Sequence, residues 1–460
     1  MWRVIKNMYR EVKSCVMVDG EHTSWFETLM GVRQGCVISP ILYSVFINGF
    51  AKDLIGKGVG GVKVGDKKLS LLLFADDIVL FAEDGGSLQA MLKVLEDYCR
   101  KWRFEVNVKK SKVMVCAEGE EGVHGVSRWM FDGKDMERIS EYKYVGVLVN
   151  EKGSWDSHGN FVKEKALART AEIQYWLGRH WEISAGVKVA VWKAMVLSIL
   201  RYGAEVWFLN KIPSRDLEGV QLRMLKSVLR VNKSTTDEFV RGELGAFELE
   251  RARDKSMLVW LGRIMKLDND RWVRRLFNTE WQANRKGMRT WNWKAFDLLS
   301  KYSLREELDR WKIEGMTTKW KTIVAEAVER KAIEDWRDGV RSGKKLTLYY
   351  KLKTEWGFVE YLNKASKGIV LMCRFRSGSA GVGEELARYG GGGAGVWEDD
   401  GTEKKRSGVC RAVESIEHVL VECQEYSDIR LKYRVEAANT LNLPPSLKPG
   451  RFLPSKRLTG

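Results

Sequence analysis

Two adjacent aspartates, Asp76 and Asp77, interrupt the apolar run LLLFADDIVLF at residues 71–81. Residues 71–74 and 78–81 are predicted to be the two strands of a hairpin with the acidic pair at its turn. Adjacent carboxylates repel each other, and a divalent cation such as Mg²⁺, which prefers oxygen ligands, relieves that repulsion. An ordinary exposed turn is the simpler alternative. The apolar residues on both faces of each strand predict a covered sheet, with the carboxylates at its rim.

A second candidate segment, GVRQG at residues 31–35, precedes this hairpin. It comes just before a predicted helix in which Ser39 is the cap and Pro40 the first helical residue. Arg33 can bind phosphate, the helix N-terminus favours anions, and the glycines allow a substrate to approach the backbone. Taken alone, the segment is better explained as a simple loop and helix cap.

These segments need a framework of mixed helices and strands in residues 1–150. The helix that begins at Ser39 is predicted to have one apolar face, formed by Leu42, Val45, Phe46 and Leu54. Ser87 is predicted to cap the next helix, whose apolar residues at helical spacing are Leu88, Met91, Leu92, Leu95, Cys99 and Trp102. Further strands are predicted near Cys116 and at residues 142–149. This order is typical of an α+β domain.

Residues 155–365 read almost entirely as helix, and many tryptophans there lie among Arg and Lys: Trp272, Trp281, Trp291, Trp293, Trp311, Trp320 and Trp336. We interpret most of them as core residues, with base stacking as the alternative.

The net charge favours a polyanionic partner. The 460 residues include 78 Lys and Arg against 61 Asp and Glu, a net charge of +17, which fits nucleic acid or an anionic membrane surface. The seven cysteines are scattered, which favours a reducing compartment. The first residues lack the apolar core of a signal peptide, and Lys193 interrupts the most apolar later segment. We therefore expect a soluble protein, nuclear or cytoplasmic and not secreted, with no membrane partner.

Four segments, in this order, resemble the reverse transcriptases of non-LTR (LINE-type) retrotransposons: RQGCVISPILYSVFINGF, LLLFADDIVLF, NVKKSKVMV and YKYVGVLV. The resemblance runs from residue 1 to about 250 and returns near 373–430. It implies an α+β partial polymerase palm followed by a mostly α-helical thumb and C-terminal region. The implied division is a palm at 1–150, a thumb-like region at 151–250, a basic Trp-rich helical region at 251–365, a degenerate zinc-knuckle-like segment at 366–435 and a flexible tail at 436–460.

The resemblance also implies roles for single residues. Asp76 would be the principal ligand of Mg²⁺ and Asp77 its partner, in a site that normally holds two ions. Arg33, Gln34 and Gly35 match the segment that positions the incoming nucleotide and the template.

Three further positions match the family near the reacting groups. Phe74 would pack against primer or nucleotide. Lys110 matches a lysine near the triphosphate, where it could neutralise pyrophosphate or act as a general acid; a solvated turn lysine is the alternative. Tyr144, Val145 and Gly146 match a strand that supports the primer end.

One catalytic carboxylate of the family has no counterpart in these segments. The family's palm carries it on a strand that precedes the part matched by the start of this sequence. Asp53 and Glu83 are the nearest carboxylates, but neither lies in a matching motif. We therefore expect little or no activity from this chain alone, since the metal site needs ligands from both strands.

Cys410, His418 and Cys423 have a spacing that resembles the C-terminal zinc-knuckle-like segment of these retroelements. Relatives carry another cysteine three positions before the first, where this chain has Ser407. Structural Zn²⁺ sites almost always have four ligands, so we expect a weakened site that does not bind zinc. Cys373 is a candidate for the missing fourth ligand, but nothing in its surroundings supports that role. The simpler alternative to a metal site is that Cys410 and Cys423 are merely buried.

The predicted function is RNA-directed DNA polymerase activity, with an RNA template, a DNA primer and dNTPs as partners. The alternative is a non-catalytic retroelement remnant that binds RNA or DNA, and a third possibility is an unrelated α+β structural protein. The sequence leaves the oligomeric state open.

Overall fold

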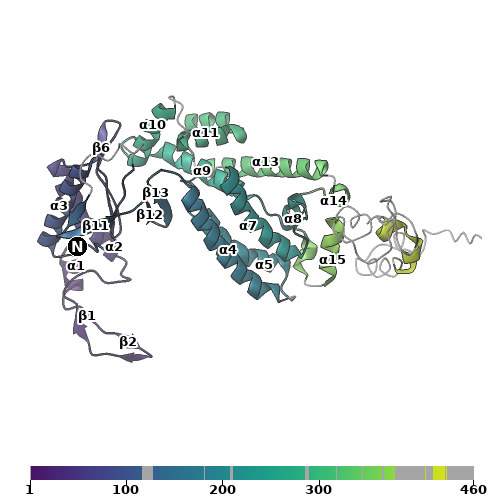
Figure 1. Cartoon of the computed structure of the whole chain (residues 1–460), viewed down its shortest axis with the longest axis horizontal. Helices are drawn as coiled ribbons and strands as arrows, with labels where there is room; N and C mark the ends of the chain where they lie inside the picture. Colours follow the sequence, from purple (N-terminus) through teal and green to yellow (C-terminus); the bar gives the residue numbers. More distant parts are fainter. Residues whose placement is uncertain are drawn as a thin grey trace, which may run out of the picture. The chain divides into compact units, whose positions relative to one another are not determined.

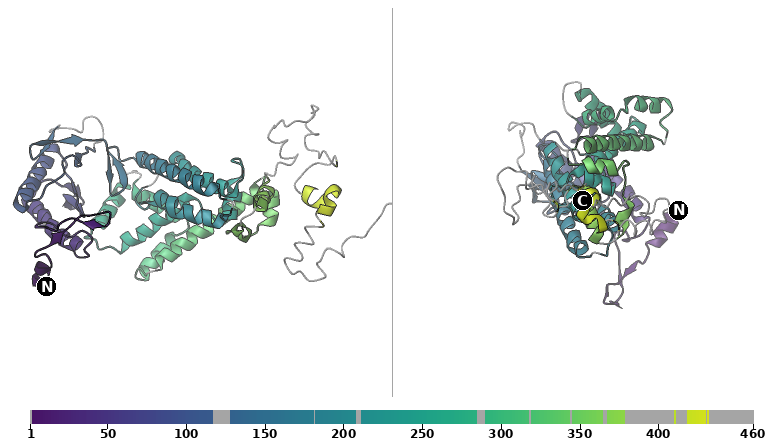
Figure 2. Two further views of the ribbon diagram at one scale, coloured as in Figure 1. Left: turned by 90° about the horizontal axis from the view of Figure 1, so that it is seen from below. Right: turned by 90° about the vertical axis from the view of Figure 1, so that its right-hand side faces the viewer.

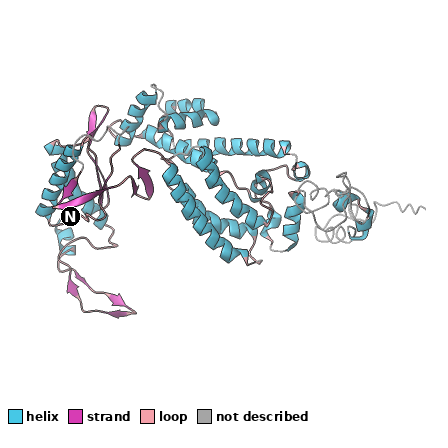
Figure 3. Cartoon of the chain, in the orientation of Figure 1, coloured by secondary structure: helices cyan, strands magenta, loops and turns pink. Residues whose placement is uncertain are grey.

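The chain divides into two compact units. The computed structural model describes residues 2–116, 128–180, 182–207, 211–284, 290–317, 319–343, 345–364, 367–378, 410, 418–429 and 431. The first unit, here called the N-terminal unit, comprises Met1–Ser154 and Leu267–Ala283; the second, the helical unit, comprises Trp155–Lys266 and Asn284–Gly460. All the described strands precede residue 151, and helices make up nearly all the described secondary structure after it (Figure 3). The predicted five-part division stays a prediction.

The N-terminal unit combines four helices with short paired strands (Figure 1). The helices are α1 (Trp2–Met8), α2 (Ser39–Lys57), α3 (Gly85–Trp102) and α10 (Trp272–Asn284). The antiparallel pairs are β1 (Lys13–Ser14) with β4 (Phe26–Glu27), β2 (Met17–Val18) with β3 (Glu21–His22), β5 (Val62–Val64) with β6 (Lys67–Leu69), β7 (Leu71–Phe74) with β8 (Asp77–Leu80), and β12 (Glu141–Tyr144) with β13 (Val147–Asn150). A three-stranded sheet has the order β10 (Trp129–Phe131), β11 (Lys134–Arg138), β9 (Lys112–Val113), with β9 parallel to β11.

Helices α2 and α3 pack together and form the core of the N-terminal unit. Phe50, Leu54 and Met91 are completely buried between them. The Tyr98 hydroxyl donates a hydrogen bond of 2.6 Å to the Phe46 carbonyl, so an α3 side chain is tied to the α2 backbone. This packing gives the short strands a rigid support.

The start of α2 differs from the predicted cap. Ile38 is the N-cap and makes no side-chain capping bond, while Ser39 is the first helical residue. The Ser39 hydroxyl instead donates to the Arg33 carbonyl at 2.7 Å, which fixes the preceding loop. The predicted buried face is wrong at Val45, which is 70% exposed, because Ile47 and Phe50 face the core instead.

The cap of α3 was also predicted three residues too late. Asp84 is the N-cap, and its carboxylate accepts a hydrogen bond of 2.8 Å from the Ser87 backbone N–H. The Ser87 hydroxyl donates to the same carboxylate. Aspartate and serine are equally good N-cap residues, so the sequence alone does not decide whether Asp84 or Ser87 is the cap.

Helix α10 follows the helical unit in sequence but belongs to the N-terminal unit. Its Arg275 guanidinium bridges two carboxylates, Asp66 at 2.5 Å and Asp270 at 2.7 Å. Lys67 pairs with Asp270 at 3.3 Å. These ion pairs attach α10 to the turn between β5 and β6.

The helical unit confirms the predicted helical character of residues 155–365, as Figure 2 shows. Its elements are α4 (Asp156–Gly178), α5 (Ala185–Trp192), η2 (Lys193–Leu197), α6 (Ser198–Arg201), α7 (Lys211–Leu229), α8 (Asp237–Leu244), α9 (Leu249–Lys266), α11 (Trp291–Lys301), α12 (Arg305–Ile313), α13 (Trp320–Ser342), α14 (Thr347–Leu352), η3 (Glu360–Asn363), α15 (Lys367–Arg376), η5 (His418–Glu422) and η6 (Gln424–Tyr426). Among the described helices, none is both long and apolar enough to cross a membrane.

Three of the tryptophans confirm the core interpretation. Trp311, Trp320 and Trp336 are at most 6% exposed. Each indole N–H donates to a backbone carbonyl, so its one polar group is satisfied inside the protein. Trp293 is 42% exposed, and the side chain of Trp281 lies outside the described part of the structure.

Candidate functional site

The acidic pair lies at the tip of the hairpin formed by β7 and β8. Phe74 pairs with Asp77, so the two-residue turn consists of Ala75 and Asp76. Ala75 has a φ of +51°, the left-handed conformation that such tight hairpin turns require. The hairpin is confirmed, but the prediction that both aspartates form the turn is wrong by one residue. Asp76 is in the turn, and Asp77 is the first residue of β8.

Only one face of this hairpin packs against the core. Leu71, Leu73 and Ile78 contact the buried residues of α2 and α3. On the other face Leu72 is 38% and Phe74 is 59% exposed. The predicted covering of both faces is therefore wrong for the described residues, because alternate side chains of a strand point to opposite faces and helices cover only one of them.

The two carboxylates are exposed and uncompensated. Within the described residues, neither Asp76 nor Asp77 makes an ion pair or a side-chain hydrogen bond. Burial and, to a smaller extent, the negative charge of Asp76 raise the pKa of the Tyr43 phenol in α2. Burial and the charge of Asp77 raise the pKa of Tyr144 in β12 in the same way. The acidic tip therefore lies within electrostatic range of both elements.

The segment YKYVGVLV forms a hairpin, where the sequence predicted a single strand. Strands β12 and β13 pair with Tyr144 opposite Val147, which leaves Val145 and Gly146 as the turn. Their φ angles are +45° and +83°. Glycine adopts such angles freely, whereas a β-branched residue such as Val145 is strained there by about 1–3 kcal/mol. The charge of Asp77 therefore acts on Tyr144, the residue that directly precedes this strained turn.

The loop that contains Arg33 contacts α1 and α2. The Arg33 guanidinium donates to the Met8 carbonyl at 2.5 Å and lies 5.7 Å from the centre of the Tyr9 ring. Gln34 is exposed, and Gly35 has a φ of +79°, which accounts for a glycine there. No hydrogen bond or ion pair joins Arg33 to the acidic tip in the described structure. The assignment of Arg33, Gln34 and Gly35 to nucleotide and template positioning stays a prediction.

Lys110 lies in an exposed turn before β9. Its backbone N–H donates to the Asn107 carbonyl at 3.1 Å and to the Asn107 side chain at 3.2 Å. In the described part of the chain its ammonium has no carboxylate partner. It is available to an anion, but no contact connects it to Asp76 or Asp77.

Tyr43 is a neighbour of the site that the sequence analysis missed. It lies one helical turn after Ser39, is partly buried and responds to the charge of Asp76. Its position four residues after the predicted cap was the available signal, since residues i and i+4 of a helix share a face.

With this geometry in view, comparison with known families shows what the N-terminal part of the chain resembles. Residues 2–149 match the family model described as "Reverse transcriptase (RNA-dependent DNA polymerase)". The match contains the acidic hairpin, the Arg33 loop and the β12–β13 hairpin. This part of the chain is therefore similar to the reverse transcriptases.

Individual relatives confirm the predicted resemblance to non-LTR retrotransposon polymerases. The RNA-directed DNA polymerase from mobile element jockey of Drosophila melanogaster is 25% identical over 237 residues, 49% of this chain and 25% of the relative. A Pol polyprotein from type-2 retrotransposable element R2DM of the same species is 29% identical over 163 residues, 32% of this chain and 14% of the relative. A putative uncharacterized transposon-derived protein of Caenorhabditis elegans is 25% identical over 291 residues, 59% of this chain and 97% of the relative. The match thus spans a quarter of the jockey polymerase's length.

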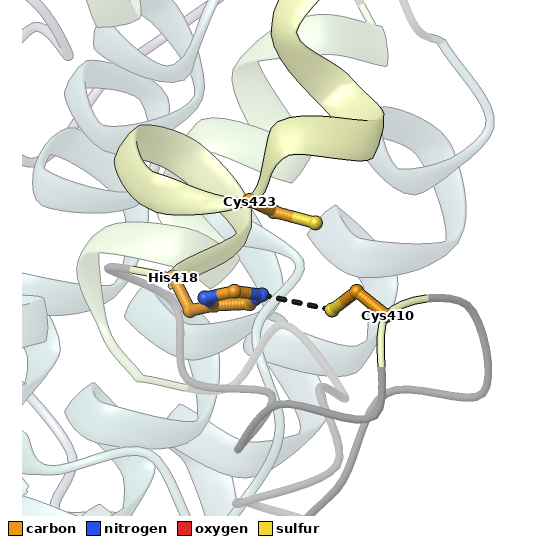
Figure 4. A group of neighbouring side chains, drawn as sticks. All are labelled: Cys410, His418 and Cys423. Atoms are coloured by element: carbon orange, nitrogen blue, oxygen red, sulfur yellow. Dashed lines mark hydrogen bonds between the residues drawn. The ribbon is translucent and has the colours of Figure 1, made fainter. Parts of the chain in front are cut away.

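Cys410, His418 and Cys423 lie close together (Figure 4). Their potential ligand atoms all lie within 4.8 Å of one another. The Cys410 Sγ and His418 Nε2 are 3.1 Å apart, and Cys423 is buried. The other ring nitrogen of His418 lies 3.6 Å from the Glu422 carboxylate, an arrangement that also orients metal-bound histidines. Ser407 lies outside the described residues, and Cys373 contacts the Tyr361 hydroxyl instead.

We expect the purified full-length chain to retain less than about 0.1 zinc per molecule after dialysis, because three protein ligands make an incomplete structural site. Elemental analysis measures this directly. A Cys410→Ser variant is the matched control and should give the same zinc content. One zinc per chain, lost in that variant, would contradict the prediction.

Proposed function

We propose that the N-terminal unit carries the acidic part of a reverse transcriptase active site. RNA would be the template, DNA the primer and dNTPs the substrates of template-directed nucleotidyl transfer to the primer 3′ end. The observation that carries the proposal is the exposed hairpin tip, where Asp76 and Asp77 have no cationic partner among the described residues. Such a pair fits Mg²⁺, which binds through one or two carboxylates together with substrate phosphates.

Each residue near the tip would have a distinct task. Asp76 and Asp77 would hold Mg²⁺, which supplies activation of the 3′-hydroxyl and stabilisation of the leaving oxygen in this chemistry. The exposed ring of Phe74 would pack against the primer or the nucleotide. Tyr144 and the turn at Gly146 would support the primer end, and their electrostatic proximity to Asp77 supports this assignment.

The chain by itself would polymerise poorly. In the described residues, no third His, Cys, Asp or Glu converges with Asp76 and Asp77. Two carboxylates from one hairpin leave a two-metal site short of ligands. A binding role without synthesis is the second candidate, and the net charge of +17 favours it.

A metal-directed cleavage experiment tests the site without requiring synthesis. The full chain is bound to an RNA template with an annealed DNA primer, and Fe²⁺ replaces Mg²⁺ to generate hydroxyl radicals at the metal. We expect cleavage of the primer near its 3′ end, and we expect Asp76→Asn and Asp77→Asn to reduce it by at least about 5-fold, since each removes a metal ligand.

Asp19→Asn is the matched control. Asp19 is also exposed with a positive φ of +51°, in the turn between β2 and β3. The Asp19→Asn chain should give the same primer cleavage as the unmodified chain. Primer extension with Mg²⁺ accompanies the experiment, and we expect no synthesis above the level of the Asp76→Asn chain. Equal cleavage in all variants would reject the metal site, and robust synthesis lost in Asp76→Asn would reject the expected inactivity.

A further inference from the structure

A small basic pocket lies in the helical unit, far along the sequence from the acidic hairpin. It is formed by the beginning of α5, the end of α7, the η3 turn and the beginning of α15; the three helices are labelled in Figure 1. Its volume is about 40 Å³. That is room for about three water molecules, or for one tetrahedral oxyanion.

The charged side chains that line the pocket are all cationic. They are Lys188, Arg230 and Lys364, and the remaining lining residues are uncharged. Lys188 is only 7% exposed. Burial, together with the neighbouring positive charge of Arg230, lowers the pKa of Lys188. Placing two cations together at a partly dry site is costly unless an anion joins them.

Backbone contacts hold both cations at the pocket. The Lys188 ammonium donates to the His180 carbonyl at 2.9 Å, and the Arg230 guanidinium donates to the Gly178 carbonyl at 3.0 Å. The Lys188 ammonium has further N–H donors, since an ammonium has three. The nearby carboxylate of Glu182 partly offsets the charge of Lys188, but it is exposed and lies 2.5 Å from the His180 ring.

The rest of the lining also suits an anion. Ala185 is in the first turn of α5, and Ile369 and Val370 are in the first turn of α15. The N-terminal turns of helices carry free N–H groups and a partial positive charge. Cys373 in the pocket wall stays a neutral thiol, because burial is the main factor that raises its pKa to about 11.

We infer that this pocket binds a phosphate group through Lys188, Arg230 and Lys364, and that the phosphate belongs to the backbone of a nucleic-acid strand. An Arg fork and a Lys ammonium are the side chains that bind phosphate most strongly. The phosphate site stands on the pocket itself, and only its assignment to a nucleic acid depends on the proposed function.

Thermal unfolding of the full chain with inorganic phosphate tests the site, at an ionic strength held constant with chloride. We expect a rise in Tm that saturates with phosphate concentration, because only the folded chain has the pocket. Lys188→Met and Arg230→Met should abolish the rise. Lys364→Met changes an exposed residue that does not endanger folding, and it should weaken phosphate binding by about 3–10-fold. Lys321→Met, an exposed lysine of α13, is the control and should keep the rise.

Binding of a labelled single-stranded RNA over a range of salt concentrations identifies the source of the phosphate. We expect Arg230→Met and Lys364→Met each to lower affinity by about 3–10-fold and to reduce the salt slope by about one, while Lys321→Met changes neither. A phosphate-dependent Tm with unchanged RNA binding would overturn the nucleic-acid assignment and leave free phosphate as the ligand. No phosphate effect on Tm would overturn the site itself. Primer extension enters neither measurement, so failure of the proposed function is distinguishable from both outcomes.

Discussion

Replacing Arg376 with leucine is expected to destabilise the helical unit by about 3–5 kcal/mol, because it leaves a buried carboxylate without its cationic partner. Glu243 in α8 has no exposed surface. The Arg376 guanidinium donates to its Oε1 at 2.8 Å, and the Tyr361 hydroxyl donates to its other oxygen. Removing the guanidinium leaves the negative charge without its ion-pair partner in a site that has no exposed surface. Urea unfolding monitored by circular dichroism measures the loss.

Two further variants show whether the pairing is responsible. Arg374→Leu removes the same kind of side chain from an exposed position of α15 and should change stability by less than about 0.5 kcal/mol. The double variant Glu243→Leu/Arg376→Leu should recover much of the loss, since replacing both members of a buried pair by apolar residues is often neutral. A double variant less stable than Arg376→Leu would contradict this explanation.

Replacing Gly262 with alanine is expected to destabilise the chain by about 3 kcal/mol, the upper end of the cost of overpacking a core. Gly262 in α9 packs directly against the Trp320 ring, and a Cβ there would overlap ring atoms. The ring cannot move aside easily, because its N–H donates to the Leu258 carbonyl at 2.8 Å and it packs on Trp311. Steric overlap therefore outweighs the gain in helix propensity that alanine brings.

Gly219→Ala is the matched control for this substitution. Gly219 is inside α7, and a Cβ there would meet nothing within 4 Å. The same chemical change should stabilise the chain by about 0.5–1 kcal/mol, since alanine is the better helix former. Opposite signs of the two changes in urea unfolding support the packing explanation. An equal effect at both positions would indicate that helix propensity alone decides the outcome.

Sequence patterns predicted the elements of this chain better than their exact boundaries. The hairpin around Asp76, the helix after Pro40 and the helical character of the second half depend on local periodicity and turn chemistry, which a sequence displays directly. The one-residue shift of the turn to Ala75 does not depend on local periodicity or turn chemistry. The positive φ of this alanine results from the pairing of the two strands, which the sequence does not display. The same reason explains why Val145 was assigned to a strand.

Contacts between distant segments could not be predicted in the same way. Asp76 and Asp77 were recognised as a pair, but their proximity to Tyr43 and Tyr144 depends on how α2 and β12 pack around the hairpin. The pocket at Lys188 collects side chains from four elements, and its lining residues run from Ile183 to Cys373. No spacing rule connects such residues, whereas the spacing of Cys410 and His418 was visible because both lie in one short segment.

The N-terminal unit is made of two separate segments of the chain, and this affects any attempt to divide the protein. A single protease cut after Ser154 would release a fragment without Leu267–Ala283. That fragment would lose the Arg275 partner of Asp66, and the remainder would carry α10 away from the strands it binds. Separating the polymerase-like unit in a folded form therefore requires three cleavages, after residues 154, 266 and 283, with retention of the excised helix, or a linker that rejoins it to residue 154.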